Sequence, residues 1–272
     1  MLPSTGHGGK DELTQSPSAD WNPAQYERFR DERSRPFFDL LDLVQPRPEM
    51  RVVDLGCGTG ELTRELHQRL SARETIGIDN SPAMLAKSAA FAGDGLRFDH
   101  GDIGAFTSEG GYDLVFSNAA LQWVPDHQPL FRRLTAALTE RGQLAVQMPA
   151  NNDHPSHLTA FAIAGEPPFR EALGGYERQW PVLAPEAYAT LLHRLGYRRQ
   201  HVRLQVYAHE LESREAVVEW VRGSLLTDYE RRLPTDLWPH FLERYRERLL
   251  PQLEDARSFF YPFKRVLMWG SR

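Results

Sequence analysis

Short apolar runs alternate with segments of helical spacing between residues 50 and 150 of the chain. The runs have the length of strands, are rich in β-branched or aromatic residues, and end at polar residues, Gly or Pro. Between them, apolar side chains recur every three or four positions, as at Leu62, Leu66 and Leu70. The predicted strands lie at 51–55, 74–79, 96–98, 112–118 and 144–149, and a further helix is predicted through 130–138. This alternation predicts an α/β fold with a mostly parallel sheet covered by helices on both faces.

The segments outside this region differ in composition. Residues 1–19 contain almost no apolar side chains, so we expect a disordered tail that cannot offset its ordering entropy. Residues 20–150 form the predicted core, and 151–262 are richer in aromatic and arginine residues and are predicted to form a mainly helical cap over the carboxyl ends of the strands. Helical patterns in the cap lie near 154–164, 185–195, 213–225 and 236–250, with one strand at 203–209 returning to the sheet. A final edge strand is expected at 263–272.

Composition excludes several classes of protein. Charged residues make up 25% and hydrophobic residues 41% of the chain, as in soluble globular proteins. The net charge of -5 and the pI near 6.1 argue against a general nucleic-acid binder, and no apolar run is long enough to span a membrane. Cys57 is the only cysteine, which excludes an intramolecular disulfide, and the N-terminus has no hydrophobic signal core. We therefore expect a cytoplasmic protein, a monomer or weak homodimer, that binds neither nucleic acid nor membrane.

The first predicted strand ends in a glycine-rich turn. Asp54 is followed by Gly56, Gly58 and Gly60, and a helical pattern begins immediately afterwards. Glycines at such a turn allow positive φ angles and let the backbone approach a ligand closely. The unpaired N–H groups and the positive dipole end of the following helix face the same point. The turn is therefore predicted to bind a nucleoside-containing ligand.

The glycine spacing distinguishes between ligand classes. The dinucleotide pattern G-x-G-x-x-G requires a third glycine at position 61 when counted from Gly56, or at position 63 when counted from Gly58. These positions hold Glu61 and Thr63, so the pattern is not met. A phosphate-binding loop requires a Lys after the glycines, and none is present. The pattern that remains is D-x-G-x-G-x-G.

Acidic residues also follow the next two predicted strands. Asp79 lies about twenty residues beyond the glycines, where an acidic side chain accepts hydrogen bonds from ribose hydroxyls, and Ser81 with Pro82 predicts a capped helix directly after it. Asp102 follows the third strand, a position that borders the ligand crevice in an open α/β sheet. Together with Asp54, these residues predict one binding site at the carboxyl edge of the sheet.

The D-x-G-x-G-x-G motif resembles that of S-adenosylmethionine-dependent methyltransferases with a Rossmann-like fold. Further segments make the resemblance more specific, and together they are similar to trans-aconitate 2-methyltransferases from about residue 21 to the C-terminus. These segments are 21–26, 31–33, 118–127, 147–149 with 151, 155–157, and 219–223. Arg222 departs from the Lys that is expected in many relatives, and the two cations differ in geometry.

This resemblance implies S-adenosylmethionine as the cofactor. Asp54 and the glycine backbone would hold its methionine end, Asp79 its ribose, and Asp102 its adenine amine. Trp21 and Tyr26 would fold over it as a lid. The implied cofactor-binding residues are Trp21, Tyr26, Asp54, Gly56, Gly58, Gly60, Asp79, Asn80, Met84, Asp102, Ile103, Asn118 and Ala119.

The resemblance also implies methyl transfer to a carboxylate of a small polycarboxylic acid, with trans-aconitate as the favoured case. A carboxylic acid is already ionised at neutral pH, so no catalytic base and no metal ion are expected. Fixed donors such as Arg would hold the remaining carboxylates, with Arg222 the favoured candidate. The candidate substrate-binding residues are Gln122, Trp123, Gln147, His157, Arg170, Tyr176, Trp180, Arg222, Tyr261 and Lys264.

Two alternatives remain open at this point. The same fold could methylate a hydroxyl or amine of another small metabolite, in which case His127 or His157 would be needed as a base. The chain could also bind the cofactor as a regulatory or partner protein without turnover. A dinucleotide oxidoreductase is disfavoured by the glycine spacing.

Overall fold

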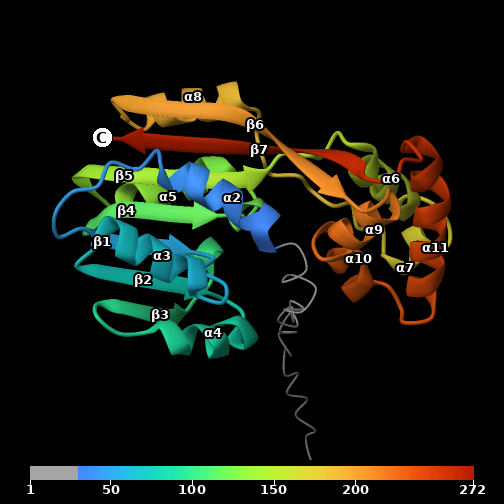
Figure 1. Ribbon diagram of the computed structural model, residues 1–272, viewed down its shortest axis with the longest axis horizontal. Helices are drawn as coiled ribbons and strands as arrows, with labels where there is room; N and C mark the ends of the chain where they lie inside the picture. The colour runs from blue at the N-terminus through green and yellow to red at the C-terminus, as the bar shows by residue number, and fades with distance from the viewer. Residues whose placement is uncertain (1–29) are drawn as a thin grey trace, which may run out of the picture.

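The computed structural model describes residues 30–272, with side chains from residue 34 onward. Trp21, Tyr26 and the predicted tail at 1–19 lie outside the described residues. A seven-stranded sheet in the order β3-β2-β1-β4-β5-β7-β6 forms the centre of the molecule (Figure 1). The strands are β1 (Arg51–Leu55), β2 (Glu74–Asp79), β3 (Leu96–His100), β4 (Tyr112–Asn118), β5 (Leu138–Pro149), β6 (Arg199–Leu211) and β7 (Phe259–Ser271). Strands β1 to β5 are parallel, and β7 is antiparallel to both of its neighbours.

Helices connect the strands and cover the sheet. The α-helices are α2 (Arg30–Leu41), α3 (Glu61–Leu70), α4 (Pro82–Ser88), α5 (His127–Ala136), α6 (Pro155–Ala164), α7 (Phe169–Ala172), α8 (Pro185–Arg194), α9 (Glu215–Arg222), α10 (Leu225–Arg232) and α11 (Leu237–Leu249). Short 3-10 helices lie at η1 (Ala89–Phe91), η2 (Ile103–Ala105), η3 (Leu121–Trp123) and η4 (Leu250–Gln252). None of the helices in residues 30–272 combines the length and apolarity that a membrane crossing requires.

Alternate residues of the central strands are buried on opposite faces of the sheet. Val52 of β1 packs in one cluster with α2 and α3, whereas the next residue, Val53, packs in a second cluster with α5 and α8. Leu114 and Val115 of β4 divide between the two clusters in the same way. This two-faced burial explains the nearly continuous apolar runs in the sequence. The predicted Rossmann-like, mostly parallel α/β fold is confirmed.

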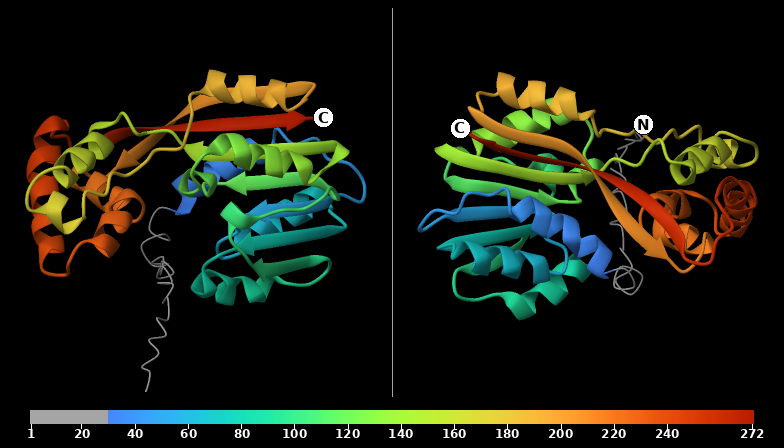
Figure 2. Two further views of the ribbon diagram at one scale, coloured as in Figure 1. Left: turned by 180° about the vertical axis from the view of Figure 1, so that it is seen from behind. Right: turned by 45° about the horizontal axis from the view of Figure 1, so that its top comes forward.

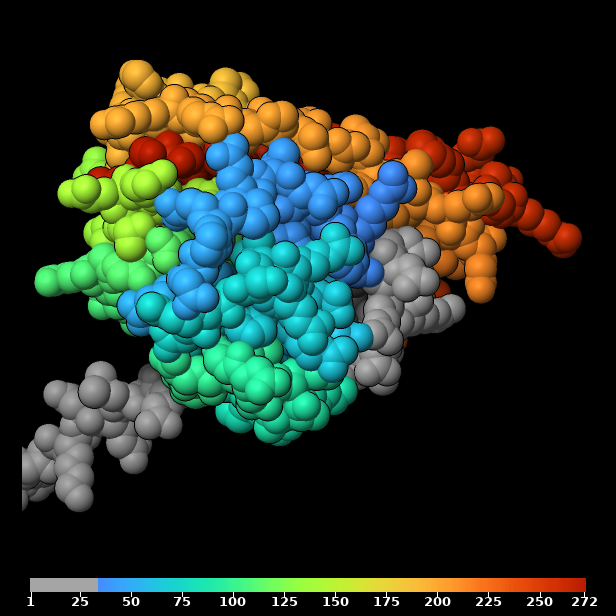
Figure 3. Space-filling model, turned by 60° about the vertical axis from the view of Figure 1, so that its left-hand side comes forward, coloured from blue at the N-terminus to red at the C-terminus, as the bar shows by residue number. Residues whose placement is uncertain are grey.

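The expectation that 263–272 is the edge strand is wrong. Strand β7 lies between β5 and β6 and pairs with both, so β6 is the edge. The reason is burial on both faces: Val266 and Met268 lie in one cluster, and Leu267 and Trp269 lie in the other. Figure 3 shows β6 along the upper border of the molecule, with only a small part of β7 visible beneath it.

Strands β6 and β7 each have 13 residues and pair antiparallel, although residues 212–258 lie between them in the sequence, and the pair continues beyond the parallel strands (Figures 1 and 2). At its far end, Leu211, Phe259, Tyr261 and Phe263 join a third hydrophobic cluster. Helices α6, α7, α9, α10 and α11 supply most of the remaining residues of this cluster, and we call them the cap helices. They lie beyond the carboxyl ends of the parallel strands (Figure 1).

Two local predictions in this region also need correction. Helix α8, expected in the cap because it lies within 151–262, packs on the sheet through Tyr188, Leu191 and Leu192. It packs on the sheet and not in the cap because the chain has already returned from the cap before it enters β6. The helix predicted through 130–138 ends at Ala136, and Leu138 already begins β5.

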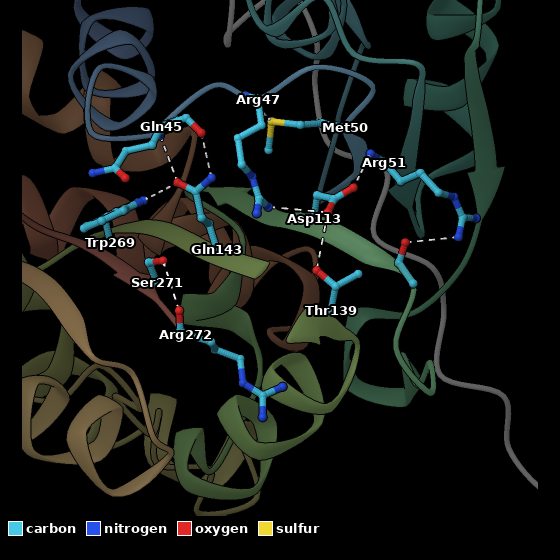
Figure 4. A network of polar contacts seen from close by, with 11 residues as sticks. Gln45, Arg47, Met50, Arg51, Asp113, Thr139, Gln143, Trp269, Ser271 and Arg272 are labelled. Carbon is cyan, nitrogen blue, oxygen red and sulfur yellow. Dashed lines mark hydrogen bonds and ion pairs between the residues drawn. The ribbon is translucent and has the colours of Figure 1, made fainter. Parts of the chain in front are cut away.

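A polar network lies at the amino ends of β1 and β4, at the edge of the sheet opposite the carboxyl ends of the parallel strands (Figure 4). The Asp113 carboxylate accepts hydrogen bonds from the Arg51 backbone N–H at 3.0 Å and from the Thr139 hydroxyl at 3.3 Å. The Gln143 amide exchanges hydrogen bonds of 2.8 and 2.7 Å with the Gln45 backbone, and its oxygen also accepts from the Trp269 indole at 2.9 Å. These contacts anchor the loop before β1 and the C-terminal strand far from the carboxyl edge.

Candidate functional site

The three glycines after β1 have positive φ angles of 83°, 56° and 79° at Gly56, Gly58 and Gly60. A Cβ at Gly56 would lie 2.2 Å from the Cβ of Ala120, and a Cβ at Gly60 would lie 2.7 Å from the Phe98 ring. These two glycines are therefore required by packing as well as by conformation. A Cβ at Gly58 would meet no atom of residues 30–272 within 4 Å, so within this part of the chain Gly58 faces open space at the carboxyl edge of the sheet. It is the position in the turn that a ligand can approach.

Asp79, the last residue of β2, holds this turn. Its Oδ2 accepts a hydrogen bond from the Gly58 backbone N–H at 2.9 Å, and its Oδ1 accepts one from the Ser81 backbone N–H at 2.9 Å. Each carboxylate oxygen retains a lone pair for a further donor such as a ribose hydroxyl. Ser81 caps α4 by accepting a hydrogen bond from the Met84 backbone N–H, as predicted. Asn80 is exposed beside it, and Met84 is buried.

Asp54 of β1 is a buried acid beneath the turn. The Thr63 hydroxyl of α3 donates a hydrogen bond of 2.6 Å to its Oδ2. Burial raises the pKa of Asp54 to about 7; the hydrogen bond from Thr63 opposes this rise, and the negative charge of Asp79 adds to it. Protonation of Asp54 is therefore sensitive to any charge that binds at the turn.

The ends of β3 and β4 border the same edge. Asp102 is exposed and caps η2 by accepting a hydrogen bond from the Gly104 backbone N–H at 2.8 Å. Ile103 is half-buried against the cluster that contains α5 and α8. At the end of β4, the Asn118 side-chain oxygen accepts a hydrogen bond of 2.6 Å from the Gln147 amide of β5. The buried Arg265 guanidinium donates to the Gln147 oxygen at 3.2 Å, which fixes the orientation of that amide.

The turn after β4 is held in a conformation that L side chains rarely adopt. Ala119 has φ of 55°, and the Gln122 amide donates a hydrogen bond of 2.7 Å to its carbonyl. The Gln122 side-chain oxygen is buried and has no hydrogen-bond partner within residues 30–272. Such a group is normally satisfied by a protein, water or ligand donor. This strained turn lies directly behind Gly56, since it places Ala120 against that residue.

His127 has a structural role. Its Nε2 lies 3.0 Å from the Leu121 carbonyl oxygen, and its Nδ1 bonds to the Tyr188 hydroxyl. Since a carbonyl only accepts, Nε2 carries the proton and Nδ1 accepts from Tyr188. Burial lowers the pKa of His127, which keeps the ring neutral. Both nitrogens are thus engaged within the protein.

Several of the predicted substrate residues gather at the start of α6 and on the facing part of β7. The Tyr261 hydroxyl lies 3.3 Å from the Asn151 amide nitrogen and 3.2 Å from the Ser156 hydroxyl, and burial raises the pKa of Tyr261 to about 12. The His157 Nδ1 lies 3.1 Å from the same Ser156 hydroxyl. Burial is the main cause that lowers the pKa of His157 to about 3. Lys264 forms an ion pair with Asp153.

Other candidates lie apart from this group. Arg222, the favoured cation in the sequence, has Glu219 and Glu230 each at 4.0 Å, so two carboxylates already offset its charge. Arg170 is exposed on α7. Tyr176 donates a hydrogen bond of 2.7 Å to Asp228 of α10.

A buried arginine that the sequence reasoning missed links the cap to the end of β4. The Arg178 side chain is only 7% exposed, and its Nη1 donates to Asp228 at 2.8 Å. Its guanidinium carbon lies 4.7 Å from the centre of the Trp123 ring in η3, and Trp123 is 40% exposed. Two residues further on, the Trp180 ring packs edge-on against His157. The structure therefore brings Trp123, His157 and Trp180 together around a cation that was not predicted.

Within the part of the chain that the structure describes, no group of three or more His, Cys, Asp or Glu residues could hold a metal ion.

Comparison with known proteins bears on this site. A family model described as a methyltransferase domain matches residues 46–166. A trans-aconitate 2-methyltransferase of Deinococcus radiodurans is 45% identical over 258 residues, covering 93% of this chain and 98% of the relative. One of Escherichia coli is 37% identical over 256 residues, covering 93% and 99%.

Solved structures with a similar fold include the YcgJ protein of Bacillus subtilis, with a TM-score of 0.56 and 15% identity over 88% of this chain and 98% of that one. A phosphoethanolamine N-methyltransferase 2 of Haemonchus contortus, in complex with phosphomonomethylethanolamine and S-adenosylhomocysteine, gives a TM-score of 0.51 at 16% identity, covering 88% of this chain and 52% of that one. At these identities, the likeness concerns the fold alone.

Proposed function

The chain belongs to the trans-aconitate 2-methyltransferase family, and from this premise we propose that it transfers a methyl group from S-adenosylmethionine to a carboxylate oxygen of trans-aconitate. The products are a monomethyl ester and S-adenosylhomocysteine. The observation that carries this proposal is the open face of Gly58 beside Asp79 and above Asp54, at the carboxyl edge of an open α/β sheet.

The residues at this edge fit the cofactor. Gly58 leaves room for the methionine end, and the buried Asp54 can ionise to balance its positive charge. Asp79 retains lone pairs for the ribose hydroxyls, while Asn80, Met84, Asp102 and Ile103 border the adenine position. Asn118 and Ala119 lie where the reacting methyl would face the acceptor. Trp21 and Tyr26, outside the described residues, remain proposed lid residues.

When bound, S-adenosylmethionine supplies a methyl carbon activated by a sulfonium sulfur. A carboxylate oxygen of the acceptor would donate an electron pair to that carbon, and the carbon–sulfur bond would break with its electron pair left on sulfur. The carboxylate charge and the sulfonium charge disappear together. Since the acceptor is already ionised at neutral pH, no proton has to move, and the protein acts by aligning the two reactants and excluding water.

The two buried histidines that a hydroxyl or amine acceptor would require as bases are poorly suited to that role. Both nitrogens of His127 are engaged within the protein. His157 is buried beside Ser156, and its low pKa makes it a weak base. This supports a carboxylate acceptor over the alternative acceptors.

We further propose a small polycarboxylic acid as the only ligand besides the cofactor, a cytoplasmic location, and action as a monomer or weak homodimer without nucleic acid. Size-exclusion chromatography with light scattering measures the assembly state. A stable tetramer would contradict this part of the proposal.

The test of the proposed reaction is an acceptor panel. The protein is incubated with S-adenosylmethionine and trans-aconitate, a monocarboxylate, a phenol or a primary amine, and products are identified by mass spectrometry. The proposal expects a monomethyl ester from trans-aconitate. With S-adenosylmethionine at saturation, the rate should be nearly constant between about pH 6 and pH 8 because the acceptor stays ionised. Methylation of the phenol or amine alone would overturn it.

A further inference from the structure

The loop between α7 and α8 presents alternate side chains to the interior. Tyr176 and Trp180 are half-buried and the Arg178 side chain is buried, whereas Glu177 and Gln179 between them are exposed. A period of two is typical of an extended segment, in which every second side chain lies on one side. Arg178 and Trp180 are therefore presented to the same side of the loop, toward the end of β4 and the start of α6.

The charge around Arg178 is unbalanced. Asp228 accepts hydrogen bonds from Arg178 at 2.8 Å and from Arg232 at 3.1 Å, so one carboxylate serves two guanidinium groups. The oxygen that Arg178 contacts is also shared with the Tyr176 hydroxyl. Arg232 is 47% exposed and water can solvate its charge, whereas Arg178 is 7% exposed. The surplus positive charge is therefore least well compensated at Arg178.

Two buried donors point to a ligand at this place. Arg178 Nε and Trp180 Nε1 are both buried, and neither has a hydrogen-bond partner in residues 30–272. Buried N–H groups in native proteins almost always have an acceptor. Two such donors on alternate residues beside a surplus positive charge match the two oxygens and the negative charge of a carboxylate.

The surroundings place this group next to the reaction. Arg178 lies over the Trp123 ring, and Trp123 belongs to η3, which begins three residues after β4 ends at Asn118. On the other side, the ring of His157 packs edge-on against Trp180 at 5.7 Å. Two other cations considered for substrate binding have acidic partners of their own, since Arg222 has two glutamates and Lys264 has Asp153. The third, Arg170, is exposed on α7.

We propose that Arg178 and the Trp180 indole N–H bind a carboxylate of the acceptor other than the one that is methylated. This inference rests on the proposed function and assigns the acceptor subsite that the reaction requires. The site selects acids with at least two carboxylates, because one must occupy the Arg178 subsite while another faces the methyl group. A monocarboxylate can occupy only one of the two positions.

The test measures binding without turnover. Isothermal titration calorimetry follows trans-aconitate binding to the protein saturated with S-adenosylhomocysteine, for the wild type and for Trp180→Phe and Arg178→Met. Trp180→Phe keeps an aromatic side chain and removes the indole N–H, together with the five-membered ring that carries it. We expect the dissociation constant to rise about tenfold in Trp180→Phe and roughly tenfold to hundredfold in Arg178→Met, since hydrogen bonds to charged groups have such effects.

Arg244→Met is the matched control, because Arg244 is a partly exposed cation on α11 with one ion-pair partner, Glu247. It should bind trans-aconitate like the wild type, and all variants should bind S-adenosylhomocysteine with unchanged affinity. Thermal melts verify folding. If Arg178→Met is unfolded, Trp180→Phe alone decides the question.

The outcomes separate this inference from the proposed function. Unchanged trans-aconitate affinity in folded Trp180→Phe and Arg178→Met would overturn the subsite even if the wild type methylates trans-aconitate. Weakened affinity in both variants would support the subsite even if no ester forms, which would instead overturn the proposed function. Absence of any trans-aconitate binding by the wild type would overturn the subsite as well.

Discussion

The carboxylate of Asp79 accepts a hydrogen bond from the backbone N–H of Gly58 at 2.9 Å, which ties the end of β2 to the turn after β1. The same side chain therefore shapes the glycine turn, and we propose that its remaining lone pairs accept hydrogen bonds from a ribose. We expect Asp79→Ala to raise the dissociation constant for S-adenosylhomocysteine roughly tenfold to hundredfold, through loss of a charged acceptor. Calorimetry measures this, with Asp99→Ala, an exposed acid on β3, as the control. Equal affinity of the two variants would contradict the assigned role.

Substitutions at the glycines should separate packing from ligand access. Gly56→Ala brings a methyl group to 2.2 Å from Ala120, so we expect a loss of unfolding free energy of about 1–3 kcal/mol or more from overpacking. Gly58→Ala meets open space and costs only about 1–2 kcal/mol through its positive φ. It should nevertheless weaken S-adenosylhomocysteine binding, because the new methyl group occupies the side that the ligand approaches. Thermal denaturation and calorimetry together check this, and a Gly58→Ala variant with normal cofactor affinity would argue against that placement.

Asp54 predicts a pH-dependent affinity for the positively charged cofactor. With a pKa of about 7 in the unliganded protein, the side chain is partly protonated at neutral pH, and a bound cation favours its ionised form. Affinity for S-adenosylmethionine should therefore fall as the pH is lowered from about 7.5 to 6, with release of a proton on binding. Calorimetry in buffers of different ionisation enthalpy measures that proton. In Asp54→Asn, both the proton release and this pH dependence should be absent.

The raised pKa of Asp54 also determines how the free energy of unfolding changes with pH. Its pKa in the folded protein is raised, whereas an unfolded Asp ionises near its model value of 3.8. Below that value both states are protonated and the group has no effect. As the pH rises toward 7, only the unfolded state ionises, so the folded state is progressively destabilised, by up to about 4 kcal/mol. Asp54→Asn should thus gain stability relative to the wild type at pH 8 compared with pH 4, as urea denaturation at the two values would reveal.

The network at the opposite edge of the sheet should affect stability without affecting binding. Gln143→Leu removes two hydrogen bonds with the Gln45 backbone and one from Trp269, and it leaves the buried Trp269 indole N–H unpaired, which together costs about 2–4 kcal/mol. Because these residues lie at the amino ends of the strands, the KM values for both substrates should not change. Chemical denaturation and steady-state kinetics test the two parts. A large change in KM would indicate that this edge is coupled to the site.

Local signals in the sequence were sufficient to predict the parallel part of the fold. Strand β4 spans Tyr112–Asn118 as predicted, and Ser81 caps α4, because apolar runs and capping chemistry depend on neighbouring residues only. The position of β7 depends instead on long-range pairing. Its run from Val266 to Trp269 is apolar on both faces, which is typical of an interior strand, and this signal favours the observed order over an edge position.

Part of the candidate site could likewise be predicted from the local sequence, and part of it could not. The position of Asp54, the glycines and Asp79 at one edge could be predicted from spacing, since the strand ends of a parallel sheet meet there. Arg178 could not, because its environment depends on Asp228, fifty residues later, and on Trp123 in another part of the fold. The available signal was the spacing of Arg178, which lies two residues from Tyr176 on one side and two residues from Trp180 on the other. Arg222 was favoured because of its apolar helix, but the residues beside it in space are acidic.

The central claim is most directly tested by following a labelled methyl group. The protein is incubated with S-adenosylmethionine that carries a deuterated methyl group, together with trans-aconitate, and the reaction is analysed by liquid chromatography and mass spectrometry. We predict one labelled monomethyl ester of trans-aconitate, formed together with an equal amount of S-adenosylhomocysteine. Cofactor binding without any labelled ester, or label found only on a hydroxyl or amine acceptor, would contradict the account.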